Sequence, residues 1–277
     1  MSNETHTFDP FCNEPAYIKL NHQMIDRLLR QLKGLKSINV LDVAAGTGLM
    51  SQIALEKAAA AGAKLRTTLL DFDLPALKQA RIELENSPDA QYIFGSADTL
   101  PFVPQNYDAI IFANFLHLLD NESKEKALAE GYRVLKPGGV LAMNSTFYEG
   151  AYPEESKPFY SRWIRRAIME INRRLPNRSK GEKVQAMEFL PSDRYQELIN
   201  GAGFKVVEVR ERRALLSQSA VRAISSYMEF AKGALHATDE DAEQAAQALQ
   251  VTVKQTFNEL RMKYLPRNWL EIVAVKA

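Results

Sequence analysis

Short apolar runs rich in β-branched residues alternate along the chain with longer stretches whose apolar positions recur at helical spacing. This alternation predicts a parallel sheet with helices packed on its faces, the α/β class of fold. Seven strands are predicted, at Asn39–Val43, Arg66–Asp71, Gln91–Phe94, Tyr107–Phe112, Gly139–Asn144, Phe204–Arg210 and Trp269–Val275. Between the fourth and fifth, "ESKEKALAEGYRVLKPGG" predicts a helix that ends at Pro137 and two glycines.

Two helical segments, 148–190 and 214–264, interrupt the second half of this alternation. In the first, "FYSRWIRRAIMEINRRL" places apolar residues at helical spacing, and its stripe through Trp163, Ile164 and Ile168 is predicted to face a cleft or the sheet edge. In the second, 217–264 is predicted to be helical, with Thr238 and Asp241 at a helix cap.

The last predicted strand follows both inserted segments, at the very end of the chain. Because we expect it to close the same sheet, residues 1–277 are predicted to form one domain rather than two. Within it, 1–37 is predicted to be an N-terminal helical cap.

Composition and charge narrow the classes of protein that fit this pattern. The 277 residues are 46% hydrophobic, and 35 Lys and Arg nearly balance 34 Asp and Glu, so overall charge predicts no nucleic-acid partner. Cys12 is the one cysteine, which rules out an intrachain disulfide and fits a reducing compartment. No apolar run reads as a signal peptide or a membrane span, so a soluble, cytoplasmic protein is predicted.

The first predicted strand and its loop, "VLDVAAGTGLM", carry the strongest chemical signal. Gly46 and Gly48 allow a backbone to approach a ligand closely and to start a helix there. A dinucleotide fingerprint requires a third glycine, which is missing here. Asp42, at the end of the strand, would repel an anionic pyrophosphate and attract the amino group of an amino-acid-like ligand.

At this point the sequence resembles the class I S-adenosylmethionine (SAM)-dependent methyltransferases, whose first motif reads acid-x-x-x-Gly-x-Gly. The resemblance implies that Asp42 lies near the methionyl amino group and that the bare loop, including Ala44, accommodates the methionyl part of SAM. It also implies a doubly wound, mostly parallel seven-stranded Rossmann-like sheet with an antiparallel last strand, on which the inserted helices form a lid.

Later segments resemble the same family in the correct order, so that 38–147 reads as the SAM-binding half. Asp71 matches the acid that accepts hydrogen bonds from both ribose hydroxyls, and Phe72 the apolar residue against the adenine. "GSADTLPF" resembles the segment that reads the adenine edge, where Ser96 replaces the usual Asp. Either Ser96 or Asp98 then accepts the adenine amino hydrogen, with Ala97 between them.

Four further residues are candidates for the site. Asn114 follows the fourth strand at the sheet edge where open α/β folds bind ligands. His117, one helical turn on, and Tyr148 are candidate catalytic bases, with packing of His117 under the sheet edge as its alternative. In related enzymes a tyrosine placed like Tyr17 touches the methionyl end, although core packing explains Tyr17 equally well. Nothing has metal-ligand spacing, so no metal is predicted.

The predicted function is in-line transfer of a methyl group from SAM to a small-molecule acceptor. One alternative is an NAD-dependent Rossmann oxidoreductase, which shares the glycine pair and an acid some twenty residues later. Another is a SAM-binding regulatory protein without catalysis.

The segment 157–183 is strongly basic, with nine Lys or Arg against Glu170 and Glu182. It predicts either a solvated lid helix whose arginines pair with acidic residues elsewhere, or a basic face for an anionic group. That group would belong to an anionic or lipid-like substrate, an acidic carrier protein or an anionic membrane surface.

Overall fold

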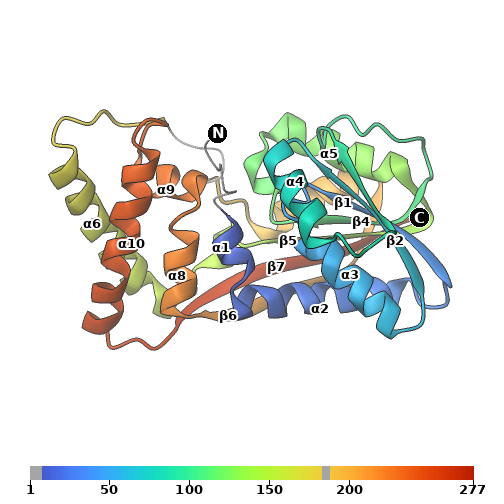
Figure 1. Cartoon of the computed structure of the whole chain (residues 1–277), viewed down its shortest axis with the longest axis horizontal. Helices are drawn as coiled ribbons and strands as arrows, with labels where there is room; N and C mark the ends of the chain where they lie inside the picture. The colour runs from blue at the N-terminus through green and yellow to red at the C-terminus, as the bar shows by residue number, and fades with distance from the viewer. Residues whose placement is uncertain (1–7, 183–187) are drawn as a thin grey trace.

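The computed structural model describes residues 8–182 and 188–277, and its seven strands form one sheet in the order β3-β2-β1-β4-β5-β7-β6 (Figure 1). The first five strands run parallel, whereas β7 is antiparallel to both of its neighbours. This arrangement confirms the predicted fold class. The strands are β1 (Ser37–Val43), β2 (Lys64–Asp71), β3 (Ala90–Phe94), β4 (Tyr107–Ala113), β5 (Leu135–Ser145), β6 (Phe204–Leu216) and β7 (Leu265–Lys276).

Helices cover both faces of this sheet. On one face α2 (Pro15–Gln31) and α3 (Leu49–Ala60) pack against inward residues such as Val40 and Ile111. On the other, α5 (Asn121–Val134) and α7 (Ser192–Gly201) cover the alternate residues. The remaining helices of this half are α1 (Asp9–Cys12) and α4 (Leu74–Glu83). Because alternate strand residues face opposite layers, the buried strands read as nearly continuous apolar runs.

The inserted helices form a second body at the far ends of β6 and β7 (left in Figure 1). They are α6 (Lys157–Arg174), α8 (Gln218–Ile224), α9 (Met228–Leu235) and α10 (Ala242–Glu259). β6 and β7 are longer than predicted because their pairing continues from Phe204↔Lys276 to Leu216↔Leu265, which carries the chain out to these helices. Their apolar faces share one core with Phe11 and Tyr17.

One predicted boundary needs correction. α5 ends at Val134 and β5 begins at Leu135, because Leu135 pairs with Tyr107 four residues before the predicted strand start. The segment 217–264 is helical, as predicted, and forms α8, α9 and α10; at the predicted cap the Thr238 hydroxyl accepts a hydrogen bond from Asp241 N before α10. The apolar stripe of α6, predicted to face a cleft or the sheet edge, packs against α10, where the Trp163 indole donates to Leu249 O, and Trp163 also lines a small cavity.

Candidate active site

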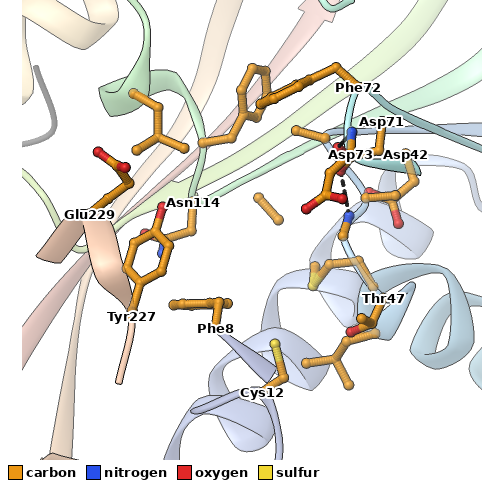
Figure 2. Close-up of a pocket in the computed structure, with 18 of the residues that line it drawn as sticks. Phe8, Cys12, Asp42, Thr47, Asp71, Phe72, Asp73, Asn114, Tyr227 and Glu229 are labelled. Atoms are coloured by element: carbon orange, nitrogen blue, oxygen red, sulfur yellow. Dashed lines mark hydrogen bonds between the residues drawn. The ribbon is translucent and has the colours of Figure 1, made fainter. Parts of the chain in front are cut away.

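A cavity of about 750 Å³ opens at the carboxyl ends of β1, β2 and β4, between the sheet and the second body. Figure 2 shows Asp42, Asp71 and Asp73 on one side of it, and Asn114, Tyr227 and Glu229 on the other. Strand ends thus supply one wall and α9 with its preceding loop supplies the opposite wall. In open α/β sheets this edge is where ligands bind.

The loop after β1 adopts backbone conformations that side chains disfavour. Ala44 has φ 56°, Gly46 φ 54° and Gly48 φ 88°, all in the left-handed region. Gly46 lines the cavity, and a Cβ built there would meet nothing within 4 Å. Gly48 does not line the cavity. A Cβ built there would lie 2.9 Å from Leu69 Cδ2, so this glycine faces neighbouring side chains. Gly46 therefore leaves room for a ligand, whereas Gly48 allows α3 to start against the β2 and α4 layer.

Asp42 has two oxygens in different roles. Its Oδ2 accepts hydrogen bonds from Ser51 N (3.1 Å) and Ser51 Oγ (2.8 Å), in the first turn of α3. Its Oδ1 is buried and has no hydrogen-bond partner among the described residues. Burial, against the opposing effect of the Ser51 hydrogen bonds, raises the pKa of this carboxyl to about 7. Asp42 thus caps a helix with one oxygen and offers the other to a cationic donor.

Asp71 holds the loop and lines the cavity at the same time. Its Oδ2 accepts a hydrogen bond from Gly46 N at 2.7 Å, and its Oδ1 accepts one from Asp73 N at 2.8 Å. Each carboxylate oxygen can accept more than one hydrogen bond, so these contacts orient the group without exhausting it. Asp73 in turn caps α4 by accepting from Ala76 N.

The cavity is acidic. Five carboxyl-bearing residues line it, and the described lining includes no lysine or arginine; the five are Asp42, Asp71, Asp73, Glu229 and Glu243. Such a lining favours a ligand that carries positive charge.

Tyr17, Phe72 and Asn114 also line the cavity, as the sequence predicts for ligand neighbours. Phe72 is 70% exposed, so its ring is open to a flat ligand. Asn114 has φ 53°, and its Oδ1 accepts a hydrogen bond from Thr146 N. Strained backbone at both Ala44 and Asn114 is typical of sites where a ligand fixes the geometry.

The structure does not bring Ser96, Ala97 or Asp98 into the lining of the cavity. Ser96 is exposed after β3, and the Asp98 carboxylate accepts a long hydrogen bond from Thr99 Oγ1. Whether Ser96 or Asp98 accepts a hydrogen bond from the adenine amino group stays a prediction.

His117 and Tyr148 also lie outside the cavity lining. The His117 ring stacks on Phe147 at 4.0 Å, is buried, and neither nitrogen has a partner among the described residues. Burial, reinforced by the charges of Lys124 and Arg267, lowers the pKa of His117 to about 3. The Tyr148 hydroxyl donates to Glu211 Oε2 at 2.6 Å, and burial and that carboxylate raise its pKa. Neither side chain reaches the acidic cavity in this arrangement.

Several lining residues have no local sequence signal. Phe8, Cys12, Tyr227 and Glu229 come from segments that the strand-end motifs do not include. The Phe8 ring packs edge-on against Tyr17 and Tyr227, which lie 210 residues apart in the chain. Only the packing of the second body against the N-terminal segment brings them together.

Four arginines of the basic segment 157–183 form ion pairs with two glutamates, and Lys183 lies outside the described residues. Arg162 and Arg166 pair with Glu259 of α10, and Arg173 and Arg174 pair with Glu170. Across residues 8–182 and 188–277, no helix is long and apolar enough to cross a membrane, and no cluster of three or more His, Cys, Asp or Glu is placed to bind a metal.

These side chains fit SAM, the cofactor that the resemblance implies. The partnerless Asp42 Oδ1 matches an ammonium group, and the open space at Gly46 matches a chain that must lie against the backbone. The acidic lining matches a ligand with a sulfonium and an ammonium group.

Comparisons with known proteins agree with this geometry. A family model described as a methyltransferase domain matches residues 40–139. The ubiquinone/menaquinone biosynthesis C-methyltransferase UbiE of Rickettsia bellii (strain OSU 85-389) is 29% identical over 192 residues, covering 67% of this chain and 75% of the relative. The demethylmenaquinone methyltransferase of Renibacterium salmoninarum is 38% identical over 135 residues, covering 49% of this chain and 52% of the relative.

A solved structure shares the fold at lower identity. It is the phosphoethanolamine N-methyltransferase 2 of Haemonchus contortus, in complex with phosphomonomethylethanolamine and S-adenosylhomocysteine (SAH). The TM-score is 0.51 at 17% identity, over 92% of this chain and 52% of the other. The motifs, the sheet order and these relatives together support a class I SAM-dependent methyltransferase.

Proposed function

We propose that the protein transfers the SAM methyl group to a small, ring-containing acceptor that enters from the side of the inserted helices. The single observation that carries this proposal is the partnerless, buried Asp42 Oδ1 in the same cavity as Asp71 and the open Gly46. A cationic amino acid moiety satisfies this oxygen, and the cavity has the size of a nucleoside-bearing ligand.

When bound, SAM supplies an electrophilic methyl group: the acceptor's electron pair forms a bond to the methyl carbon while the carbon–sulfur bond breaks and its electrons remain on sulfur. The residues of this chain then position and exclude water rather than perform covalent chemistry. We assign Asp42 to the ammonium, Asp71 to the ribose hydroxyls and Phe72 to the adenine face. Tyr17 and Asn114 would lie near the methionyl end, where both line the cavity.

The proposed mechanism does not use His117 as a proton acceptor. An imidazole whose pKa is lowered to about 3 is a weak base near neutral pH, and this ring lies against Phe147. An acceptor that is already anionic, or that loses its proton to water, needs no such base.

The second, smaller cavity supports an acceptor that contains a ring. It borders the first through Phe8 and Asn114, and aromatic side chains form most of its wall. The relatives from Rickettsia and Renibacterium are named for quinone methylation, which is methyl transfer to an apolar ring. Both observations favour a ring-containing acceptor over a flexible hydrophilic one.

The basic segment 157–183 gives a weaker proposal, a peripheral contact with an anionic surface or acidic carrier. Because Arg162, Arg166 and Arg174 are in ion pairs, Arg165 is the arginine best placed to supply such a contact. Co-sedimentation with phosphatidylglycerol vesicles tests it: we expect Arg165→Glu to weaken binding that Arg165→Lys retains. Equal sedimentation of both variants would leave the lid role alone.

Release of SAH from SAM, measured over a panel of quinol, phenol and carboxylate acceptors, tests the proposed function. We expect turnover with at least one ring-containing acceptor and a rise in melting temperature with SAM but not with NAD. A melting shift with NAD alone would support the oxidoreductase alternative. A SAM shift without turnover on any acceptor would support the non-catalytic alternative.

A further inference from the structure

Arg267 carries a positive charge in the interior of the protein. Its side chain is only 4% exposed, and a guanidinium stays protonated in proteins. Nε donates to Thr146 Oγ1 at 2.8 Å, Nη2 to Thr146 O at 2.7 Å and Nη1 to the Tyr160 hydroxyl at 3.1 Å. These acceptors are all neutral, and no carboxylate among the described residues forms an ion pair with Arg267.

A second buried arginine provides the contrast. Arg27 is 3% exposed, and it forms an ion pair with Glu271, which is equally buried. A buried charge is expensive unless an opposite charge compensates it. Arg27 meets that requirement within the chain. Among the described residues Arg267 has instead hydroxyls, a carbonyl and three aromatic rings, of which Tyr152 is nearest, with its centroid 4.0 Å from the guanidinium carbon.

Arg267 lines the smaller cavity, next to the cofactor cavity. This space is about 20 Å³, room for about one water molecule, and it shares Phe8 and Asn114 with the larger cavity. Asn114 accepts a hydrogen bond from Thr146 N, and Thr146 accepts two from Arg267. A continuous polar chain therefore leads from the cofactor cavity to the guanidinium. The aromatic wall consists of Phe11, Phe147, Tyr160, Trp163, Phe230 and Trp269.

We propose that Arg267, with the aromatic side chains around it, forms the subsite that receives the carboxylate of a planar, conjugated methyl acceptor. The proposal rests on the proposed function, because it names a feature of that acceptor. Thr146 and Tyr160 accept three of the five guanidinium N–H groups, so the carboxylate would bind the two that remain, one on Nη1 and one on Nη2. Because the space beside Arg267 is only about 20 Å³, the acceptor ring needs the room that displacement of the Phe8 ring opens toward the larger cavity, and the aromatic wall would then pack against that ring.

Tryptophan fluorescence reports on this subsite directly, because both tryptophans of the chain, Trp163 and Trp269, line the cavity. The full-length protein is saturated with SAH and titrated with benzoate and with benzamide, which have the same shape and differ in charge. We expect benzoate to bind about tenfold or more tightly than benzamide. Equal affinities, or tighter binding of benzamide, would overturn the proposal.

Three variants test whether Arg267 produces the preference for benzoate. Arg267→Met should bring the benzoate-to-benzamide ratio to about 1, and Arg267→Lys should leave an intermediate ratio, because it keeps the charge but loses the fork. Arg166→Met, which changes an arginine outside both cavities, is the matched control and should match wild type. A wild-type ratio in Arg267→Lys and Arg267→Met alike would contradict the assignment. If the methionine variant does not fold, the wild-type and lysine ratios still decide.

Two further outcomes are distinguishable. Phenyl phosphate binding more tightly than benzoate would overturn the carboxylate in favour of a phosphate. Failure of the wild-type protein to bind SAH in calorimetry would refute the proposed function instead, whereas normal SAH binding without a benzoate preference would refute the subsite alone.

Discussion

The cofactor cavity and the small cavity beside it have opposite chemistry. Five carboxyl-bearing residues line the first beside apolar and aromatic side chains, and it contains no basic side chain among its described residues. Aromatic rings and Arg267 form the wall of the second, and it contains no acid among its described residues. This difference indicates that the site separates two charges. In our proposal the cationic methyl donor lies on the acidic side and an anionic acceptor lies on the other.

The largest effect is expected from closing the open space at Gly46. Gly46→Val should abolish SAH binding. No protein atom lies within 4 Å of a Cβ at this position, so the added side chain would occupy the space proposed for the cofactor. Calorimetry measures binding, and circular dichroism checks the fold. Gly62→Val is the matched control, because Gly62 also has positive φ and open space but does not line the cavity. Normal SAH binding in a folded Gly46→Val protein would place the ligand elsewhere.

Asp42 is expected to make SAH affinity depend on pH, by up to about tenfold per pH unit. Burial raises the pKa of this carboxyl to about 7, so below that pH it is protonated and does not attract an ammonium. SAH affinity should therefore fall as pH drops below about 7 and level off above it. Without ligand the sign is reversed: the raised pKa favours the folded state at low pH, and this contribution is lost as pH rises from about 4 to about 7.

Asp42→Asn tests both slopes. Calorimetry from pH 5.5 to 8.5 should give a flat profile for the variant, and urea unfolding should lose the corresponding pH dependence. A sloping SAH profile in Asp42→Asn would assign the titration to another group.

A smaller effect, about fivefold in SAH affinity, is expected from Phe72→Ala, because one aromatic stack contributes on the order of 1 kcal/mol. Phe94→Ala is the control: its ring is similarly exposed, at 64% against 70%, but it lies outside the cavity lining. If both variants weaken SAH equally, exposed apolar area rather than stacking on Phe72 explains the loss.

The smallest effect is expected on the outer face of the second body. Arg166→Gln removes an ion pair with Glu259 that is partly exposed, so we expect a loss of about 0.5 kcal/mol in unfolding free energy and no change in SAH affinity. Urea denaturation measures the first and calorimetry the second. A change in SAH affinity would couple this helix to the cofactor side and weaken the contrast between the two cavities.

The acidic side of the site was predictable because its chemistry is local in sequence. Asp42, Gly46 and Asp71 stand at the ends of strands, where the alternation of apolar runs and helices fixes their place at one edge of the sheet. The mostly parallel seven-stranded sheet and its antiparallel last strand, β7, followed from the same resemblance. His117 has the right sequence distance from Asn114, but a short 3₁₀ turn at Leu116–Leu118 and packing on Phe147 direct it away from the cavity.

The other side was not predictable, because no local pattern specifies it. Arg267 lies 121 residues from Thr146, its principal hydrogen-bond partner, and only the pairing of β7 with β5 brings them together. Tyr227 and Phe8 meet through the packing of the second body. The basic pattern of 157–183 was visible in the sequence, but its ion pairs with Glu259 depend on how α6 and α10 pack.

Calorimetric titration of SAH into wild type and Asp71→Ala tests the central claim, that the cofactor binds at the acidic strand ends, most directly. Asp71 lines the cavity and accepts a hydrogen bond from Gly46 N at 2.7 Å, so its loss would remove the proposed ribose contact and the contact that holds the loop. We predict a loss on the order of 2 kcal/mol, about 30-fold in affinity, with an unchanged circular dichroism spectrum. Equal SAH affinity in the two proteins would contradict the account.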